Sequence, residues 1–181
     1  MASHESFWDR LSSLPDILIC VYGYLGDEQL ARIDSTEARK ILDTNYTGPV
    51  SLIDGFVRRV KGIKPATIIG ISSVAGDRVR SSNFHYGSAK ARFSKYLDGL
   101  RTSFESAGIY VMTIKPGYIR TKMIAHLSTP DWLTSSPELA AHQIFRAFEK
   151  RRSVVYVSPR WRLIMLVIRS IPEFIFKRMK I

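Results

Sequence analysis

Four short apolar runs, separated by long stretches with helical periodicity, most constrain the fold of this 181-residue chain. The runs cover residues 16–21, 66–73, 109–115 and 153–157. Each run is too short for a helix and contains several β-branched residues, which predicts strands. Helices are expected over residues 4–13, 34–62 and 84–107, and from Ser136 and Pro137 onward. Strands that alternate with helices predict an α/β fold, in which a parallel sheet of about four strands has helices on both faces.

Two local signals refine this outline. Asp34 followed by Glu37 has the spacing of a helix N-cap with a reciprocal acid, so we expect a capping box at the start of the helix over 34–62. The single cysteine, Cys20, lies inside the first apolar run and is expected to be buried and free of any disulfide. The first residues lack the positive start and the apolar stretch of a secretory signal, so a cytoplasmic location is expected.

The formal charge of +11 is concentrated toward the carboxyl end. Residues 149–181 hold nine Lys or Arg and two acidic residues, which accounts for +7 of the +11. Residues 159–181 are also apolar, but their longest wholly apolar run is six residues, too short to span a bilayer. Two interpretations stay open: an amphipathic helical tail at an anionic membrane surface, or a helix pair that packs on the domain of residues 1–158 or across a dimer. Nucleic acid is not an expected partner, because no recognised motif accompanies the charge.

Tyr86 and Lys90 are four residues apart in a predicted helix, so both side chains project from one face of it. An ammonium group there would stabilise the phenolate and lower the tyrosine pKa from its usual value of about 10. Ser73 ends the second predicted strand, thirteen residues before the tyrosine, and Asn45 lies twenty-eight residues before the serine. A tyrosine with a lowered pKa could transfer a proton to a carbonyl oxygen that Ser73 holds. Asn45 could order a water that connects Lys90 to solvent.

Taken singly, each of these residues is explained as well by ordinary helix or turn packing. Tyr118 and Lys122 have the same four-residue spacing, but Glu105 stands thirteen residues before Tyr118. The full set of spacings therefore occurs only around Tyr86. Together the spacings favour a site that reduces carbonyl groups.

At these residues the chain resembles the short-chain dehydrogenase/reductase family. The matching stretches are Asn-Tyr-Thr-Gly at 45–48, Ile-Ser-Ser-Val-Ala-Gly at 71–76, Tyr-Gly-Ser-Ala-Lys at 86–90 and Pro-Gly-Tyr-Ile-Arg-Thr at 116–121. The resemblance implies a Rossmann-like, doubly wound sheet, NADP or NAD as cofactor, and no metal. The catalytic residues that it implies are Asn45, Ser73, Tyr86 and Lys90. The cofactor-binding residues that it implies are Gly23, Asn45, Tyr86, Lys90, Pro116, Gly117, Ile119 and Thr121, with 116–121 against the nicotinamide ring.

The family's phosphate-binding loop, Thr-Gly-x-x-x-Gly-x-Gly, has no counterpart among the eleven glycines of this sequence. By the same resemblance the first three strands of the sheet are missing, and Met1 is expected to be an internal or misassigned start. The run over 16–21 would then be an exposed edge strand. We expect an N-terminally truncated chain with impaired cofactor binding. The residues that distinguish NADP from NAD would lie in the missing part.

The reaction that the resemblance implies interconverts a ketone and a secondary alcohol. Residues 122–136 are expected to cover the substrate pocket, and Met123, Ile124, Leu127 and Trp132 favour an apolar or lipid-linked substrate. Residues 22–27 and 159–162 weakly resemble a bacterial branch with reductases of polyprenyl-phosphate-linked keto-sugars. The alternative is a non-catalytic remnant, whose helices over 34–62 and 84–107 form a homo-oligomer interface or whose tail contacts a membrane surface.

Overall fold

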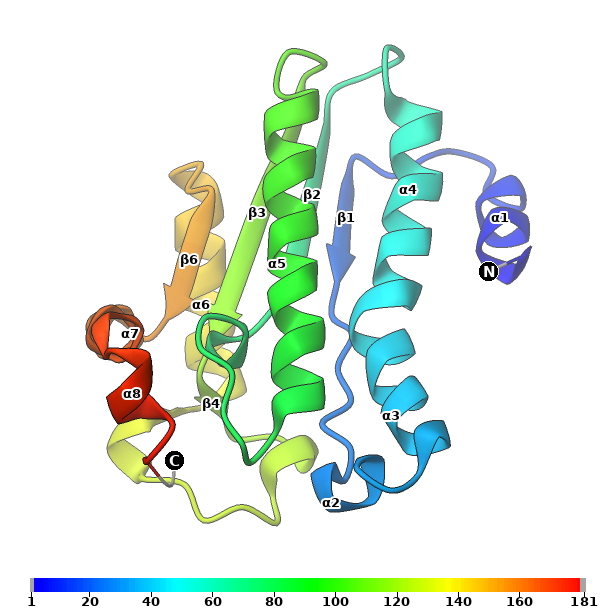
Figure 1. Ribbon diagram of the computed structural model, residues 1–181. Coiled ribbons are helices and arrows are strands. Elements are labelled where there is room, and N and C mark those ends of the chain that lie inside the picture. Colours follow the sequence, from blue (N-terminus) through cyan, green and yellow to red (C-terminus); the bar gives the residue numbers. More distant parts are fainter. Residues whose placement is uncertain (1, 180–181) are drawn as a thin grey trace.

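The protein folds around a parallel four-stranded sheet. The structure, a computed structural model, describes residues 2–179. The strands are β1 (Ile17–Cys20), β2 (Ala66–Ile71), β3 (Ile109–Pro116) and β6 (Val154–Val157). They lie side by side in the order β1-β2-β3-β6, and every neighbouring pair is parallel (Figure 1). The predicted α/β fold with a four-stranded parallel sheet is confirmed.

Helices cover both faces of the sheet. α4 (Gly48–Val60) and α5 (Phe84–Phe104) lie on one face, and α6 (Pro137–Glu149) lies on the other (Figure 1). α1 (Ala2–Asp9) packs on the outer side of α4, where Trp8 Nε1 donates to the Leu52 carbonyl at 3.1 Å. The short helices α2 (Glu28–Ala31) and α3 (Ser35–Leu42) lead into α4. Ser136 caps α6 by accepting a hydrogen bond from the Leu139 amide, as the sequence predicts.

Successive side chains along β2 and β3 point to opposite faces of the sheet, which produces two apolar cores, one on each side. Ile68 and Val111 pack toward α4 and α5, whereas Ile69 and Met112 pack toward α6. Cys20 is buried in the first core, as predicted, and burial raises the pKa of its thiol to about 12.

β1 lies at the end of the sheet. Among residues 2–179 no strand pairs with its outer edge, in agreement with the expected edge strand. Ile17 and Ile19, on the side away from α4, are 43% and 55% exposed. This end of the sheet therefore presents both unpaired backbone groups and apolar side chains to solvent.

The predicted helix over 34–62 is interrupted. A π-helical turn, η1 (Asp43–Thr47), separates α3 from α4, and Asn45 lies at its centre. Asp34 is the N-cap of α3, as expected, and accepts a hydrogen bond from the Thr36 amide at 2.7 Å. The predicted capping box is wrong, however, because Glu37 accepts hydrogen bonds from Tyr24 Oη at 2.8 Å and from the Asp27 amide at 3.0 Å. The carboxylate binds a turn that is distant in sequence instead of the end of its own helix.

Several short elements surround the carboxyl ends of the strands. A two-stranded parallel sheet joins β4 (Tyr118–Ile119) to β5 (Thr134–Ser135). Single 3-10 turns form η2 (Val74–Gly76), η3 (Lys122–Ile124) and η4 (Asp131–Leu133). These elements connect the sheet to the segments that the sequence assigns to the site.

The carboxyl-terminal segment forms two helices, α7 (Pro159–Ser170) and α8 (Glu173–Phe176), the second of which starts after Pro172. Trp161 and Met165 of α7 are buried and pack with Val74, so one side of this segment belongs to the core. Within residues 2–179, no helix has the length and apolarity to cross a membrane. Lys180 and Ile181 of the predicted tail, and Met1, lie outside the described residues.

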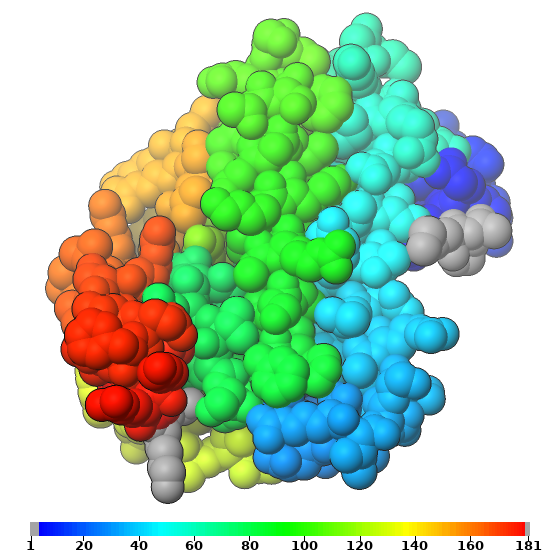
Figure 2. Space-filling model, in the orientation of Figure 1, coloured from blue at the N-terminus to red at the C-terminus, as the bar shows by residue number. Residues whose placement is uncertain are grey.

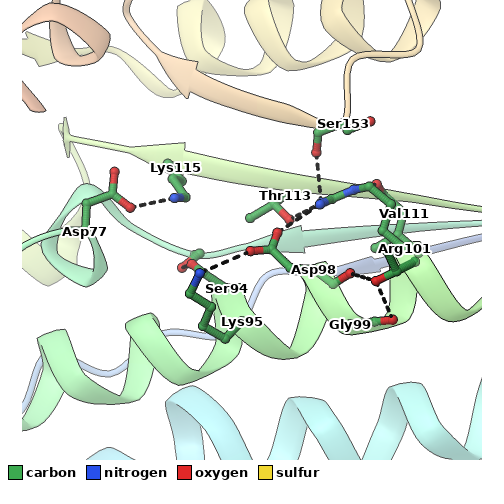
Figure 3. Close-up of polar contacts among 12 residues, drawn as sticks. Asp77, Ser94, Lys95, Asp98, Gly99, Arg101, Val111, Thr113, Lys115 and Ser153 are labelled. Atoms are coloured by element: carbon green, nitrogen blue, oxygen red, sulfur yellow. Dashed lines mark hydrogen bonds and ion pairs between the residues drawn. The ribbon is translucent and has the colours of Figure 1, made fainter. Parts of the chain in front are cut away.

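An arginine on α5 links this helix to two strands (Figure 3). The Arg101 guanidinium donates to Thr113 Oγ1 at 2.7 Å and to the carbonyls of Val111 and Ser153 at 3.1 and 3.2 Å. It also contacts Asp98 at 2.8 Å on its own helix. These bonds satisfy the hydroxyl of Thr113, which is fully buried in β3.

Candidate active site

A cavity of about 700 Å³ opens at the carboxyl ends of β1, β2 and β3. In open parallel sheets, ligands bind at this end of the strands. The residues that line the cavity include every predicted site residue except Asn45, namely Gly23, Ser73, Tyr86, Lys90, Pro116, Gly117, Ile119 and Thr121. The fold therefore brings together segments that are distant in the sequence.

Ser73 lies just after β2, at the start of η2. Its Oγ accepts a hydrogen bond from the Ala75 amide at 3.1 Å, and the residue lines the cavity together with Tyr86. Gly76 lets this turn approach α5 closely, because a Cβ there would lie 2.7 Å from the Ala91 amide nitrogen. The turn after β2 is thus held directly against the helix that carries Tyr86.

Tyr86 and Lys90 share one face of α5, as predicted, but their electrostatic relation differs from the prediction. Lys90 is buried, and its Nζ donates to the carbonyls of Tyr22 at 2.8 Å and Ile71 at 3.0 Å. The ammonium group lies 5.9 Å from the centroid of the tyrosine ring. Burial lowers the pKa of Lys90 to about 8.

Burial also raises the pKa of Tyr86, and the neighbouring side chain of Ser73 only partly opposes this effect. The predicted lowering of the Tyr86 pKa by Lys90 is therefore wrong for this structure. The physical reason is that the ammonium group points to backbone carbonyls, while the phenol is largely removed from water.

Asn45 lies behind the cavity and does not line it. It is fully buried, and its Nδ2 donates to the carbonyls of Tyr24 at 2.7 Å and Ile41 at 2.8 Å. Its Oδ1 accepts from the Tyr24 amide at 3.2 Å. Both amide protons of Asn45 are used by backbone carbonyls, so the side chain holds the loop after β1 at Tyr24, whereas Lys90 Nζ donates to Tyr22 and Ile71.

Trp161 of α7 is a cavity residue that the sequence analysis assigned only to the tail. Its Nε1 donates to the Leu133 carbonyl at 3.1 Å, and its ring meets the edge of Tyr118 with centroids 5.5 Å apart. A side chain at Gly117 would overlap this indole, so the glycine permits the contact. An apolar tail gives no signal that one of its residues packs against 116–121.

A second group that the sequence analysis missed fixes the segment after Ser73. The side chain of Asp77 is 5% exposed and accepts a hydrogen bond from Lys115 Nζ at 2.5 Å (Figure 3). It accepts a second one from Tyr156 Oη, also at 2.5 Å. Burial, and then the hydrogen bond to Asp77, raise the pKa of Tyr156 to about 12. These contacts tie the turn that follows β2 to β3 and β6. No short motif marks them, because the partners are 38 and 79 residues from Asp77.

The predicted covering segment, residues 122–136, is only partly correct. Met123, Ile124 and Leu127 line the cavity as expected. Trp132 does not line it and is 62% exposed. The tryptophan in the cavity wall is Trp161, which reaches it from α7.

The chain matches the model of a family described as short chain dehydrogenase over residues 7–132. An uncharacterised oxidoreductase of Mycobacterium tuberculosis is 31% identical over 161 residues, which cover 89% of this chain and 64% of the relative. Another, from Streptomyces coelicolor, is 30% identical over 169 residues, covering 91% of this chain and 64% of the relative. The chain thus spans less than two thirds of the length of these curated relatives.

Solved structures have the same fold. A short chain dehydrogenase from Burkholderia cenocepacia, in complex with NADP, superposes with a TM-score of 0.85 at 19% identity. The superposition covers 99% of this chain and 74% of that one. The family match, the fold, and the single cavity that Ser73, Tyr86 and Lys90 line are consistent with one another. The chain belongs to the short chain dehydrogenase family.

Proposed function

We propose that the protein is an NAD(P)-dependent oxidoreductase that interconverts a ketone and a secondary alcohol. The observation that carries this proposal is that Ser73, at the end of β2, and Tyr86, on α5, line the same cavity. In such a pair the phenol can donate a proton to a carbonyl oxygen while the serine hydroxyl holds that oxygen. Curated relatives that are oxidoreductases support the same reaction class.

The proposed roles follow from the protonation states. Because burial raises the pKa of Tyr86, the phenol is protonated at neutral pH and is a proton donor for reduction. Lys90, with a pKa of about 8, is mostly protonated at pH 7 and places a positive charge behind the phenol. In this geometry its Nζ lies 5.9 Å from the ring centroid, and the role we assign to it is to hold the turn after β1 through the Tyr22 carbonyl. A nicotinamide cofactor, when bound, supplies or accepts the hydride.

The cavity suits the nicotinamide end of such a cofactor. Pro116, Gly117, Ile119 and Thr121 line the cavity together with Tyr86, and we assign the backbone groups of Ile119 and the hydroxyl of Thr121 to the carboxamide. The NADP in the Burkholderia structure supports a dinucleotide, with NAD the alternative. The sequence contains no glycine-rich phosphate loop, and we propose that the 181-residue chain binds the cofactor weakly. Isothermal titration with NADPH and NADH tests this point, and micromolar binding would contradict it.

The substrate we propose is apolar, with a lipid-linked ketone as the specific candidate. Ile71, Ile124 and Leu127 line the same cavity as Ser73 and Tyr86, together with Met123 and Trp161. A predominantly apolar wall with a few convergent polar groups orients a ligand through its carbonyl group. A panel of ketones with increasing alkyl length is therefore the appropriate set of substrates.

Replacement of Tyr86 by Phe tests the function. We expect kcat/KM for ketone reduction to fall by roughly a hundredfold or more, because the proton donor is lost. The Kd for NADPH should change little, since the ring remains. Tyr118→Phe is the matched control, because Tyr118 also lines the cavity and also precedes a lysine by four residues. Equal activity of Tyr86→Phe and wild type would refute the proton-donor role.

A non-catalytic role is the second candidate that we propose. In it, two copies associate through α3–α4 and α5, as the resemblance implies for the predicted helices over 34–62 and 84–107. The outer side of α5 is accessible, since Arg92, Lys95 and Thr102 are exposed. Sedimentation velocity of wild type and Thr102→Arg would test this interface. A monomer at all concentrations would exclude it.

A further inference from the structure

The two carboxyl-terminal helices present an apolar surface to solvent. On α7, Trp161 and Met165 are buried, whereas Leu163, Leu166 and Val167 are 65–67% exposed. The exposed residues stand at positions i, i+3 and i+4, so they form one stripe along the helix, opposite the buried pair. On α8, Phe174 is 62% exposed and Ile175 is 45% exposed. Monomeric proteins seldom expose several large apolar side chains together without a function for them.

Basic side chains border this stripe on both sides. Arg162 and Arg169 are seven residues apart and lie on one flank of α7, while Arg160 lies on the other flank. Lys177 and Arg178 follow α8 and are exposed. The acidic residue of this region, Glu173, is paired with Arg78 at 2.6 Å. Residues 159–179 therefore carry five basic side chains against one acid that is already neutralised.

We propose that this surface, the α7–α8 surface, docks on an anionic lipid bilayer. A helix with an apolar stripe between basic residues lies in the plane of the membrane, with the stripe among the acyl chains and the cations at lipid phosphates. A nucleic acid would neutralise the cations but leave Leu163, Leu166, Val167 and Phe174 in water. An anionic bilayer accounts for both the apolar and the charged groups.

The location of the α7–α8 surface agrees with such a partner. In Figure 2 the two helices, coloured orange to red, form the lower left of the face shown, next to the yellow segment that precedes α6. Arg160 Nη1 donates to the Trp132 carbonyl in that segment at 2.8 Å, and Trp161 lines the cavity. Docking would therefore bring the bilayer close to the segment that covers the cavity. The docking proposal does not rest on the proposed function, because lipid binding requires neither cofactor nor turnover.

Vesicle co-sedimentation of the full 181-residue chain tests the proposal. One set of vesicles contains phosphatidylcholine alone, and the other contains phosphatidylcholine with phosphatidylserine. The double variant Leu166→Glu/Val167→Glu removes the stripe, and Arg162→Gln/Arg178→Gln removes two cations. The matched controls are Ile63→Glu and Lys95→Gln, which lie outside the α7–α8 surface. Ile63 is 74% exposed, and the side chain of Lys95 is 86% exposed. Point substitutions are used because deletion of α7 would also remove Trp161 from the cavity wall.

We expect wild type and both controls to bind the phosphatidylserine vesicles and to bind phosphatidylcholine alone at least tenfold more weakly. The stripe variant should lose binding, and the charge variant should bind more weakly by roughly fivefold for each cation removed. Circular dichroism and melting temperature should be unchanged, because all substituted residues are exposed. Equal binding by the stripe variant and wild type would overturn the proposal. So would binding of wild type to duplex DNA but not to vesicles, or a dimer that the stripe variant dissociates without any lipid binding.

Discussion

Gly117→Ala tests the contact between residues 116–121 and α7. A Cβ at this position would overlap Nε1 and Cε2 of Trp161 and would lie 2.6 Å from Cδ1. The indole cannot simply rotate away, because it is 3% exposed and donates a hydrogen bond to the Leu133 carbonyl. Overpacking of this kind costs about 1–3 kcal/mol in the free energy of unfolding. For a chain of this length, that cost lowers Tm by roughly 2–12 °C.

Thermal and urea unfolding measure this cost against two references. Gly99→Ala is the matched glycine variant, because a Cβ there meets nothing within 4 Å inside α5, and alanine should stabilise the helix by about 0.5–1 kcal/mol. In a Trp161→Leu background the overlap is removed, so Gly117→Ala should cost much less than in wild type. An unchanged Tm for Gly117→Ala, or an equal cost in both backgrounds, would refute the steric argument.

Two further predictions concern buried charges. Lys90 has a pKa of about 8 in the folded state and a higher one when unfolded, so the unfolded chain binds more protons between these values and stability must rise with pH. From pH 8 to 10, wild type should gain up to about 3 kcal/mol relative to Lys90→Met, and parallel urea-unfolding curves across this range would contradict the reasoning. Asp77→Asn should cost about 3–5 kcal/mol, because it leaves Lys115 without its carboxylate in a site where the side chains are 5% and 14% exposed. Asp131→Asn, which breaks the exposed pair with Arg120, should have little effect in the same assay, and equal losses for the two variants would count against a buried ion pair.

Local patterns predicted the elements of this fold well. Each apolar run became a strand of one parallel sheet, because runs of this length and composition are too short for any other buried element. Ser136 and Pro137 marked the start of α6, since capping depends on neighbouring residues only. The residue spacings also predicted that Ser73, Tyr86 and Lys90 belong to one site, and all three line one cavity. This prediction was possible because side chains project from helices and strands with fixed periodicities.

The predictions that were wrong, and the contacts that were not predicted, involve partners that are distant in the sequence. Glu37 has the spacing of a capping box, yet Tyr24 and Asp27 offer it better donors. The direction of the Tyr86 pKa shift depends on which carbonyls Lys90 reaches, and one of them, that of Tyr22, comes from the turn after β1. The cluster of Asp77, Lys115 and Tyr156 joins three segments without a motif. Such contacts are set by tertiary packing, which composition and periodicity do not report.

The π-helical turn at Asp43–Thr47 sets the angular phase between α3 and α4. A π-helical turn takes in about one residue more than an α-helical turn, so the extra residue is accommodated while the helix continues on both sides of it. Ile41 and Glu37, which precede the turn, keep their inward orientation: Ile41 is fully buried and Glu37 accepts a hydrogen bond from the Tyr24 hydroxyl. Within the turn, the Asn45 side chain donates to the Ile41 carbonyl of the same helix and to the Tyr24 carbonyl, so the irregular turn is the point at which this helix holds the loop after β1.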